Sequence, residues 1–272
     1  MTINCKGKLI DLSTSHVMGI LNVTPDSFYD GGQFNTEKNI LNQVEKMLEE
    51  GATFIDVGAY SSRPNAEHIS EEEEQNRILP ILSLILKEYP ETLISIDTFR
   101  SNVAKQCIEN GAALINDISA GNLDKNMFKT IAELKVPYVM MHMKGTPQTM
   151  KDLTDYDNLT HDILFYFSEK IAEARSLGII DLIVDPGFGF AKTLEQNYEL
   201  LGKLELFNML ELPILVGLSR KSMIYKTLEN DAQLALNGTT VLNTVALQKG
   251  ASILRVHDVK EAMECIKLVK KL

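Results

Sequence analysis

The chain has 272 residues, of which 44% are hydrophobic and 24% are charged. These proportions are typical of globular proteins and argue against a disordered or fibrous chain. The formal net charge is −10, from 27 basic and 37 acidic residues, so a nucleic-acid-binding surface is not expected.

The sequence also argues against a membrane or secreted protein. No apolar run approaches the roughly 20 residues that a membrane helix needs, and Met1–Lys6 lacks the long apolar region of a secretion signal. The cysteines Cys5, Cys107 and Cys265 are too scattered for a disulfide framework or for zinc-ligand spacing. We therefore expect a cytoplasmic protein without a membrane partner.

One pattern repeats along the chain: a short apolar run ends in a polar residue, and a loop and a helical stretch follow. Nearly continuous apolar runs are typical of parallel strands covered on both faces. The predicted strands are His16–Asn22, Thr53–Val57, Leu93–Asp97, Ala113–Asp117, Tyr138–His142, Leu182–Asp185, Ile214–Gly217 and Ile253–His257. The predicted helices are Asn35–Glu50, Glu71–Lys87, Arg100–Glu109, Lys125–Leu134, Asp157–Leu177, Thr193–Leu206, Ala232–Lys249 and Val259–Lys270.

About eight strand–helix units in a chain of this length predict an α/β fold of the (β/α)₈ TIM barrel type. No linker-like stretch interrupts the pattern, so we expect a single domain over residues 1–272. Met1–Ser15 forms a short N-terminal extension before the first barrel strand, predicted as a hairpin across the barrel bottom. The alternative is an open doubly wound sheet, which should have a glycine-rich turn after its first strand. The segment Asn22–Ser27 has no such turn.

Every predicted strand ends on, or runs directly into, a polar residue. In a parallel barrel, these ends meet at one mouth, where active sites are built. The strand-end residues are Asn22, Asp56, Asp97, Asn116, His142, Asp185, Ser219 with Lys221, and Arg255 with His257. Asp97, Asn116 and Asp185 form an acceptor-rich set that suits a flat heterocycle with adjacent N–H donors. The alternative is that these groups belong to internal salt bridges within the barrel.

The last two strands supply positive charge. Arg255 and His257 precede a helix, and Ser219–Ser222 opens the helix after strand seven. Barrels commonly bind phosphate at the loops after strands seven and eight. Two long loops, Thr24–Gly32 and Ala59–Asn65, follow strands one and two and are candidate lids over the mouth.

Seven blocks, in order, resemble the dihydropteroate synthase family over nearly the whole chain. Gly19–Phe28 with Asp30–Gly32 resembles the first family signature, and Asp56–Pro64 resembles the second. The other matching blocks are Ser95–Thr98, Ile115–Ile118, Asp185–Phe190, Gly217–Ser222 and Arg255–Asp258. The chain departs from the family pattern at Ser62, Asn65 and Ala191, which affects the loops more than any reacting group.

The resemblance implies a reaction between (7,8-dihydropterin-6-yl)methyl diphosphate and 4-aminobenzoate that gives 7,8-dihydropteroate and diphosphate. It implies a TIM barrel, a homodimer and a Mg²⁺ cofactor held by Asn22 and Asp30. The catalytic residues it implies are Asp97, Asp185 and Lys221 around the pterin, and Arg255 and His257 at the diphosphate. The substrate-binding residues it implies are Asn116 for the pterin, Ser62, Arg63, Pro64, Phe28, Phe190 and Ser222 for aminobenzoate, and Gly217 and Ser219 in the block before Ser222.

The implied mechanism is a Mg²⁺-assisted substitution with dissociative character. Two other classes remain open from the sequence. A pterin-barrel methyltransferase shares the Asp/Asn pocket but needs no diphosphate site, so Asp30, Arg63, Arg255 and His257 argue against it. The intact loop signatures argue against a pterin-binding paralogue without catalytic activity, and pterin binding without turnover of aminobenzoate would favour it.

Overall fold

The computed structural model describes residues 1–23, 33–60 and 69–272 and contains a closed barrel of parallel strands. The barrel order is β10-β3-β4-β5-β6-β7-β8-β9, and β10 pairs with both β3 and β9, which closes the ring. The barrel strands are β3 His16–Asn22, β4 Phe54–Gly58, β5 Leu93–Asp97, β6 Leu114–Asp117, β7 Tyr138–Met141, β8 Leu182–Asp185, β9 Ile214–Val216 and β10 Ala251–Val256. The predicted (β/α)₈ barrel is therefore confirmed, with every predicted strand present within two residues of its expected bounds.

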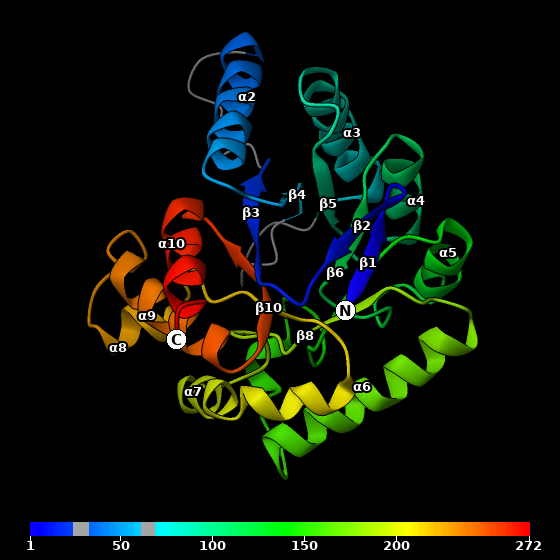
Figure 1. The fold of residues 1–272 in the computed structure, drawn as a ribbon. Coiled ribbons are helices and arrows are strands. Elements are labelled where there is room, and N and C mark those ends of the chain that lie inside the picture. The colour runs from blue at the N-terminus through cyan, green and yellow to red at the C-terminus, as the bar shows by residue number, and fades with distance from the viewer. Residues whose placement is uncertain (24–32, 61–68) are drawn as a thin grey trace.

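Helices surround the barrel in chain order (Figure 1). They are α2 Gln33–Glu49, α3 Glu71–Glu88, α4 Ser101–Glu109, α5 Met127–Leu134, α6 Leu159–Ser176, α7 Leu194–Gly202, α8 Ser222–Thr227, α9 Leu236–Gln248 and α10 Val259–Val269, with 3₁₀ segments η1 Met150–Asp152 and η2 Leu204–Leu210. None of the described helices combines the length and the apolar character needed to cross a bilayer.

Two predicted helices differ from the structure. The predicted helix Thr193–Leu206 ends at Gly202, and a 3₁₀ segment follows it. The predicted helix Ala232–Lys249 begins only at Leu236. Before it, the Asp231 carboxylate accepts from the backbone N–H groups of Gln233 and Leu234 at 2.9 and 3.2 Å, a turn that competes with helix formation.

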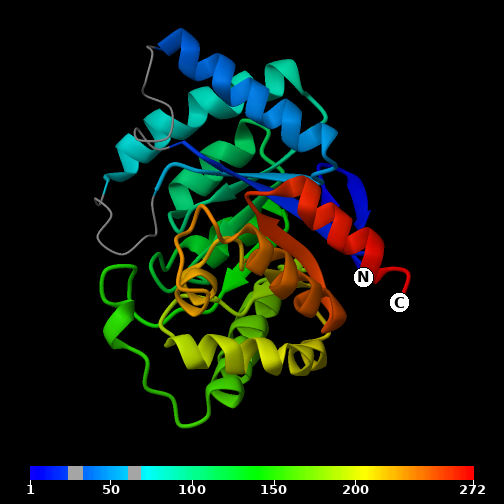
Figure 2. The ribbon, with the colours of Figure 1, turned by 90° about the vertical axis from the view of Figure 1, so that its left-hand side faces the viewer.

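The N-terminal extension forms a two-stranded hairpin, as predicted. Its strands are β1 Thr2–Cys5 and β2 Lys8–Asp11. Ile3, Cys5 and Leu12 pack with the innermost apolar layer of the barrel, which includes Phe54 and Leu114. Both chain termini lie at this end of the molecule (Figure 2). The hairpin therefore covers the barrel bottom with apolar side chains.

Alternation along the strands places polar groups above this apolar layer. The lowest inward-facing residues include Met18, Phe54, Leu93, Leu114, Val139, Ile183, Leu215 and Ile253, which form one buried cluster. Because strand side chains alternate between two faces, the next inward positions along the strands include Asp56, Asn116, Asp185 and Arg255. One step further toward the carboxyl ends are Asn22, Asp97, Ser219 and His257. The sequence pattern thus directs chemically active groups to the mouth.

Replacing Phe54 with alanine tests the importance of the apolar bottom layer. Phe54 is fully buried beneath the hairpin, so Phe54→Ala should lower the free energy of unfolding by about 3–5 kcal/mol. Urea denaturation measures this change, with Phe165→Ala on the exposed face of α6 as the control. Equal stabilities for the two variants would contradict this role of the bottom layer.

Candidate active site

The centre of the mouth is a guanidinium shared by two carboxylates from different strands. Arg255 on β10 donates through Nε to Asp56 Oδ2 at 2.5 Å and through Nη2 to Asp97 Oδ2 at 2.7 Å. Although burial opposes the charge, Asp56 and Asp97 raise the pKa of Arg255 above its usual range. The internal salt bridges that the sequence analysis left as the alternative are therefore present, at the position where a ligand was also expected.

Asp56 also orients Asn116. The Asn116 amide donates through Nδ2 to Asp56 Oδ2 at 3.1 Å in a buried contact. Two buried side-chain oxygens of barrel-strand residues have no hydrogen-bond partner among the described residues. They are Asp56 Oδ1 and Ser95 Oγ. Unsatisfied buried oxygens are uncommon in folded proteins and are typical of sites that bind something polar. From the sequence, Asp56 is expected at a strand end, without a role of its own.

Burial strongly perturbs the acidic groups. It raises the pKa of Asp97 to about 7, against the opposing effect of Arg255 and with a further rise from Asp56. Burial also raises the pKa of Asp185, while Lys221 and the Gly187 N–H group oppose that rise. Clustered, perturbed acids at a barrel mouth are typical of functional sites.

The loop after β8 joins Asp185 to Lys221. The Gly187 N–H group donates to Asp185 Oδ1 at 2.8 Å, and Lys221 Nζ donates to the Phe188 carbonyl oxygen. Burial lowers the pKa of Lys221 to about 8, although Asp185 opposes this. The Lys221 ammonium also lies 4.8 Å from the centre of the Phe190 ring.

Backbone geometry explains two residues of this loop. Gly187 has a φ of +73°, and a Cβ there would lie 2.1 Å from the His142 carbonyl oxygen, so only glycine fits. Ala191 has a φ of +48°, a left-handed conformation that is costly for a residue with a side chain. Ala191, one of the positions where the chain departs from the family pattern, is therefore strained.

The basic groups after β9 and β10 have different partners. Ser219 Oγ lies 2.9 Å from His257 Nδ1 and accepts from the His257 backbone N–H at 3.1 Å. Arg220 instead donates to both carboxylate oxygens of Asp258 at 2.8 Å. This ion pair joins Arg220 in the β9 loop to the start of α10.

Lys192 is a buried cation that the sequence analysis missed. Its ammonium contacts the carbonyl oxygens of Gly187 and Phe190, both at 2.9 Å, and His142 Nδ1 at 3.1 Å. Burial lowers the pKa of Lys192 to about 7, and Asp185 opposes this effect. No local pattern distinguishes this lysine from exposed ones, since its burial depends on how the loop folds onto β7.

Arg100 is a second residue that the sequence analysis missed. It forms a buried ion pair with Glu74 and donates to the Ile69 carbonyl oxygen at 2.6 Å. Its guanidinium also lies 5.5 Å from the centre of the Tyr60 ring. Arg100 therefore contacts Tyr60, which precedes residues 61–68, and Ile69, which follows them.

Several predicted site residues lie outside the described part of the chain: Phe28, Asp30, Ser62, Arg63 and Pro64. Of the predicted Mg²⁺ ligands, Asn22 is described, and it is exposed at the end of β3. Its amide oxygen is of the type that Mg²⁺ prefers. Within residues 1–23, 33–60 and 69–272, no group of three His, Cys, Asp or Glu side chains could hold a metal ion alone.

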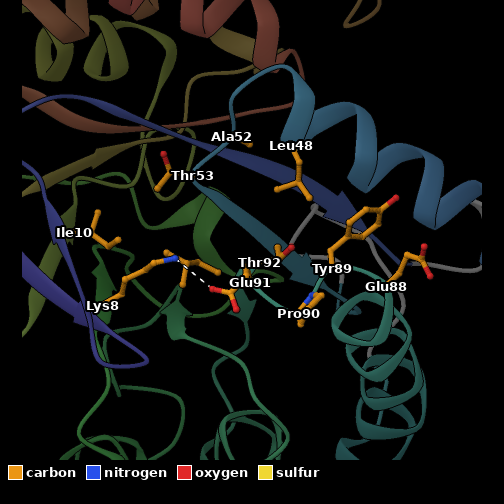
Figure 3. A pocket seen from close by; sticks show the side chains of 11 residues that line it. Lys8, Ile10, Leu48, Ala52, Thr53, Glu88, Tyr89, Pro90, Glu91 and Thr92 are labelled. Carbon is orange, nitrogen blue, oxygen red and sulfur yellow. Dashed lines mark hydrogen bonds and ion pairs between the residues drawn. The ribbon is translucent and has the colours of Figure 1, made fainter.

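A cavity of about 520 Å³ lies at the other end of the molecule, beside the hairpin (Figure 3). Its wall includes Ile10, Leu48 and Pro90. Lys8 at its rim is 3.5 Å from Glu91, which offsets its charge. Although an apolar cavity is a common indication of a ligand site, this one lies away from the carboxyl ends of the strands, where barrel chemistry occurs.

Comparison with known proteins gives a consistent result. The pterin binding enzyme family model matches residues 18–257. The dihydropteroate synthase of Escherichia coli K12 is 42% identical over 272 residues, covering 99% of this chain and 96% of that protein. A Yersinia pestis dihydropteroate synthase solved as a sulfonamide drug complex has a TM-score of 0.93 and 40% identity, covering 100% and 98% of the two chains. A Xanthomonas albilineans dihydropteroate synthase solved with 4-aminobenzoic acid has a TM-score of 0.92 and 34% identity, covering 99% and 97%.

The shared guanidinium predicts a stability effect. Arg255→Ala leaves the fully buried Asp56 carboxylate without its cation, which should lower the free energy of unfolding by about 3 kcal/mol. Urea denaturation measures the loss, and the exposed Arg175→Ala provides a matched control. An Arg255→Ala protein as stable as the control would show that the ion pairs contribute little to folding.

Proposed function

This chain belongs to the pterin-binding enzymes and, within them, to the dihydropteroate synthases. From this membership we propose a role for each residue of the site in the reaction. As a member of that family it is a transferase of folate biosynthesis. We propose that it joins (7,8-dihydropterin-6-yl)methyl diphosphate to 4-aminobenzoate. The observation that supports this most directly is the cluster of buried acids beside Lys221 and Arg255 at the barrel mouth.

In this proposal the pterin ring binds to Asp97, Asn116, Asp185 and Lys221. A carboxylate can accept two parallel hydrogen bonds from adjacent N–H groups of a flat ring, and Lys221 supplies a donor. Asp185 is buried beside Lys221, so the ring binds where water competes little for these hydrogen bonds. When the ring binds, the Lys221 ammonium turns partly away from the Phe188 carbonyl oxygen and donates a hydrogen bond to the ring.

The diphosphate lies closer to the solvent, against Arg255 and His257. When Ser219 donates its hydroxyl proton to His257 Nδ1, the neutral ring has its proton on Nε2 and can donate it to a phosphate oxygen. Gly217, which has no side chain, allows close approach beside Ser219. Asn22, with Asp30, would hold Mg²⁺, which when bound supplies positive charge at the leaving diphosphate.

The aminobenzoate site is assigned by resemblance to Ser62, Arg63, Pro64 and Phe28, together with Phe190 and Ser222. Phe190 is half-buried beside Lys221, a position suited to an aromatic substrate next to the pterin. Ser222 is the first residue of α8 and would contact the substrate carboxylate.

The reaction is a substitution at the methylene carbon of the pterin. The C–O bond to diphosphate breaks, and its electron pair leaves with the diphosphate, where Arg255 and His257 stabilise the charge. Asp97 and Asp185 stabilise the positive charge that develops on the pterin. The aminobenzoate nitrogen then forms the new C–N bond and loses a proton to water. Because an arylamine is already neutral near pH 7, this step requires no strong base.

Two further properties belong to the same proposal. We propose a homodimer formed through the outer helices, because Val241 on α9 and Leu234 in the turn before it are exposed hydrophobic residues of the kind that interfaces cover. A cytoplasmic location and a single domain over residues 1–272 stay predictions from the sequence.

Asp185→Asn tests the pterin assignment. An amide cannot accept two parallel donors as a carboxylate does, so the affinity for (7,8-dihydropterin-6-yl)methyl diphosphate should fall by about tenfold or more. Calorimetry measures the affinity, and Asp152→Asn, an exposed site, is the control. An unchanged affinity would remove Asp185 from the pterin site.

Release of diphosphate tests the reaction itself. Incubation of the protein with (7,8-dihydropterin-6-yl)methyl diphosphate and Mg²⁺ should release diphosphate rapidly only when 4-aminobenzoate is present, with 7,8-dihydropteroate formed in equal amount. Pterin binding without turnover would favour the inactive paralogue. Methyl transfer from methyltetrahydrofolate to a corrinoid, without diphosphate release, would favour the methyltransferase.

A further inference from the structure

Lys192 has no part in the reaction described above, although it contacts the loop that follows Asp185. Its side chain is buried among polar partners, with three contacts at 2.9 to 3.1 Å. Two of these partners, the carbonyl oxygens of Gly187 and Phe190, belong to the loop that follows Asp185. The third, His142 Nδ1, belongs to the residue that directly follows β7. Lys192 therefore joins the β8 loop to the neighbouring strand.

The loop that Lys192 holds determines where two pterin-site residues lie. The Gly187 N–H group binds the Asp185 carboxylate at 2.8 Å, while the Phe188 carbonyl oxygen accepts from Lys221. The His142 N–H group binds the Asp185 carbonyl oxygen at 2.9 Å. A change in the path of the loop therefore displaces Asp185 and Lys221 together.

The three contacts are chemically consistent. An ammonium has three donors, which match two carbonyl oxygens and one imidazole nitrogen. Burial and the nearby Lys192 charge hold the pKa of His142 well below its usual range, so the ring is neutral and Nδ1 can accept. Below the Lys192 pKa of about 7 the side chain is an ammonium, and its bonds to the loop are then those of a cation.

We propose that Lys192 is a positioning residue for the pterin site, which holds the Asp185–Phe190 loop against β7 so that Asp185 and Lys221 face the pterin together. The inference rests on the proposed role of Asp185 in pterin binding. Lys192 also adds positive charge close to a buried carboxylate. It thereby assists Lys221 and Arg255 in keeping Asp185 ionised, the form that accepts hydrogen bonds from the pterin.

This second effect gives a readout that loss of folding stability does not produce. Burial raises the pKa of Asp185, and the cations Lys221, Arg255 and Lys192 oppose the rise. The other groups near Lys192 are His142, described above, and Lys144, whose charge disfavours the Lys192 ammonium. Removing the Lys192 charge should raise the pKa of Asp185 further, so pterin affinity should begin to fall at a higher pH when the solution is acidified.

The test is Lys192→Met, which keeps the length of the side chain but removes its donors and its charge. We expect the affinity for (7,8-dihydropterin-6-yl)methyl diphosphate, measured by calorimetry, to fall about tenfold and its acid limb to move to higher pH. Lys192→Gln keeps an N–H₂ group without the charge. It should recover part of the affinity at neutral pH while keeping the shifted acid limb, and it serves if Lys192→Met does not fold. Lys203→Met, at an exposed lysine that follows α7, is the control.

The outcomes separate this inference from the function it rests on. If Asp185→Asn weakens pterin binding but both Lys192 variants bind as the wild type does, with an unchanged acid limb, Lys192 is not a positioning residue. A lowered melting temperature with unchanged affinity would reduce Lys192 to a structural role and overturn the inference as well. If Asp185→Asn also binds normally, the pterin assignment itself fails, and this inference with it.

Discussion

The structure of the mouth depends on one guanidinium shared by two carboxylates. Arg255 and Asp56 are 199 residues apart in the sequence, yet their side chains meet because β10 and β4 both border β3 in a closed ring. A buried carboxylate without a cation is costly, so the positions of Asp56, Asp97 and Asn116 depend on Arg255. The same ion pairs keep a cation at the place where the diphosphate is proposed to bind.

Positive and negative groups are interleaved across the mouth. Asp97 and Asp185 have pKa values raised by burial, while burial lowers the pKa values of Lys221 and Lys192. Burial disfavours each charged form, and a neighbouring group of opposite charge opposes that effect. Such a site can accept hydrogen bonds from a pterin and still attract an anion, although the chain as a whole is acidic.

The two ends of the barrel have different tasks. The hairpin end contains a buried apolar layer that includes Phe54, and changes there should affect folding stability. The opposite end contains the charged and polar groups of the proposed active site. This division is the general one for parallel barrels, in which stability residues and active-site residues lie at opposite ends of the strands.

The sequence alone determined the fold class and the identity of most mouth residues. Apolar runs that end in polar residues predict parallel strands, and the two-residue period brings Asp97, Asn116 and Asp185 to one end. Family resemblance supplied roles for them. Helix starts were less predictable, because at Leu236 a local Asp231 turn competes with the helix.

Only the tertiary structure decided which charged groups pair. Arg220 and Lys221 are adjacent in sequence, but one binds Asp258 while the other reaches the β8 loop. The contact of the buried Lys192 ammonium with His142 could not be predicted from the sequence either. The physical reason is that a strand period specifies the face on which a side chain lies, whereas its partner depends on barrel closure, strand register and the paths of loops.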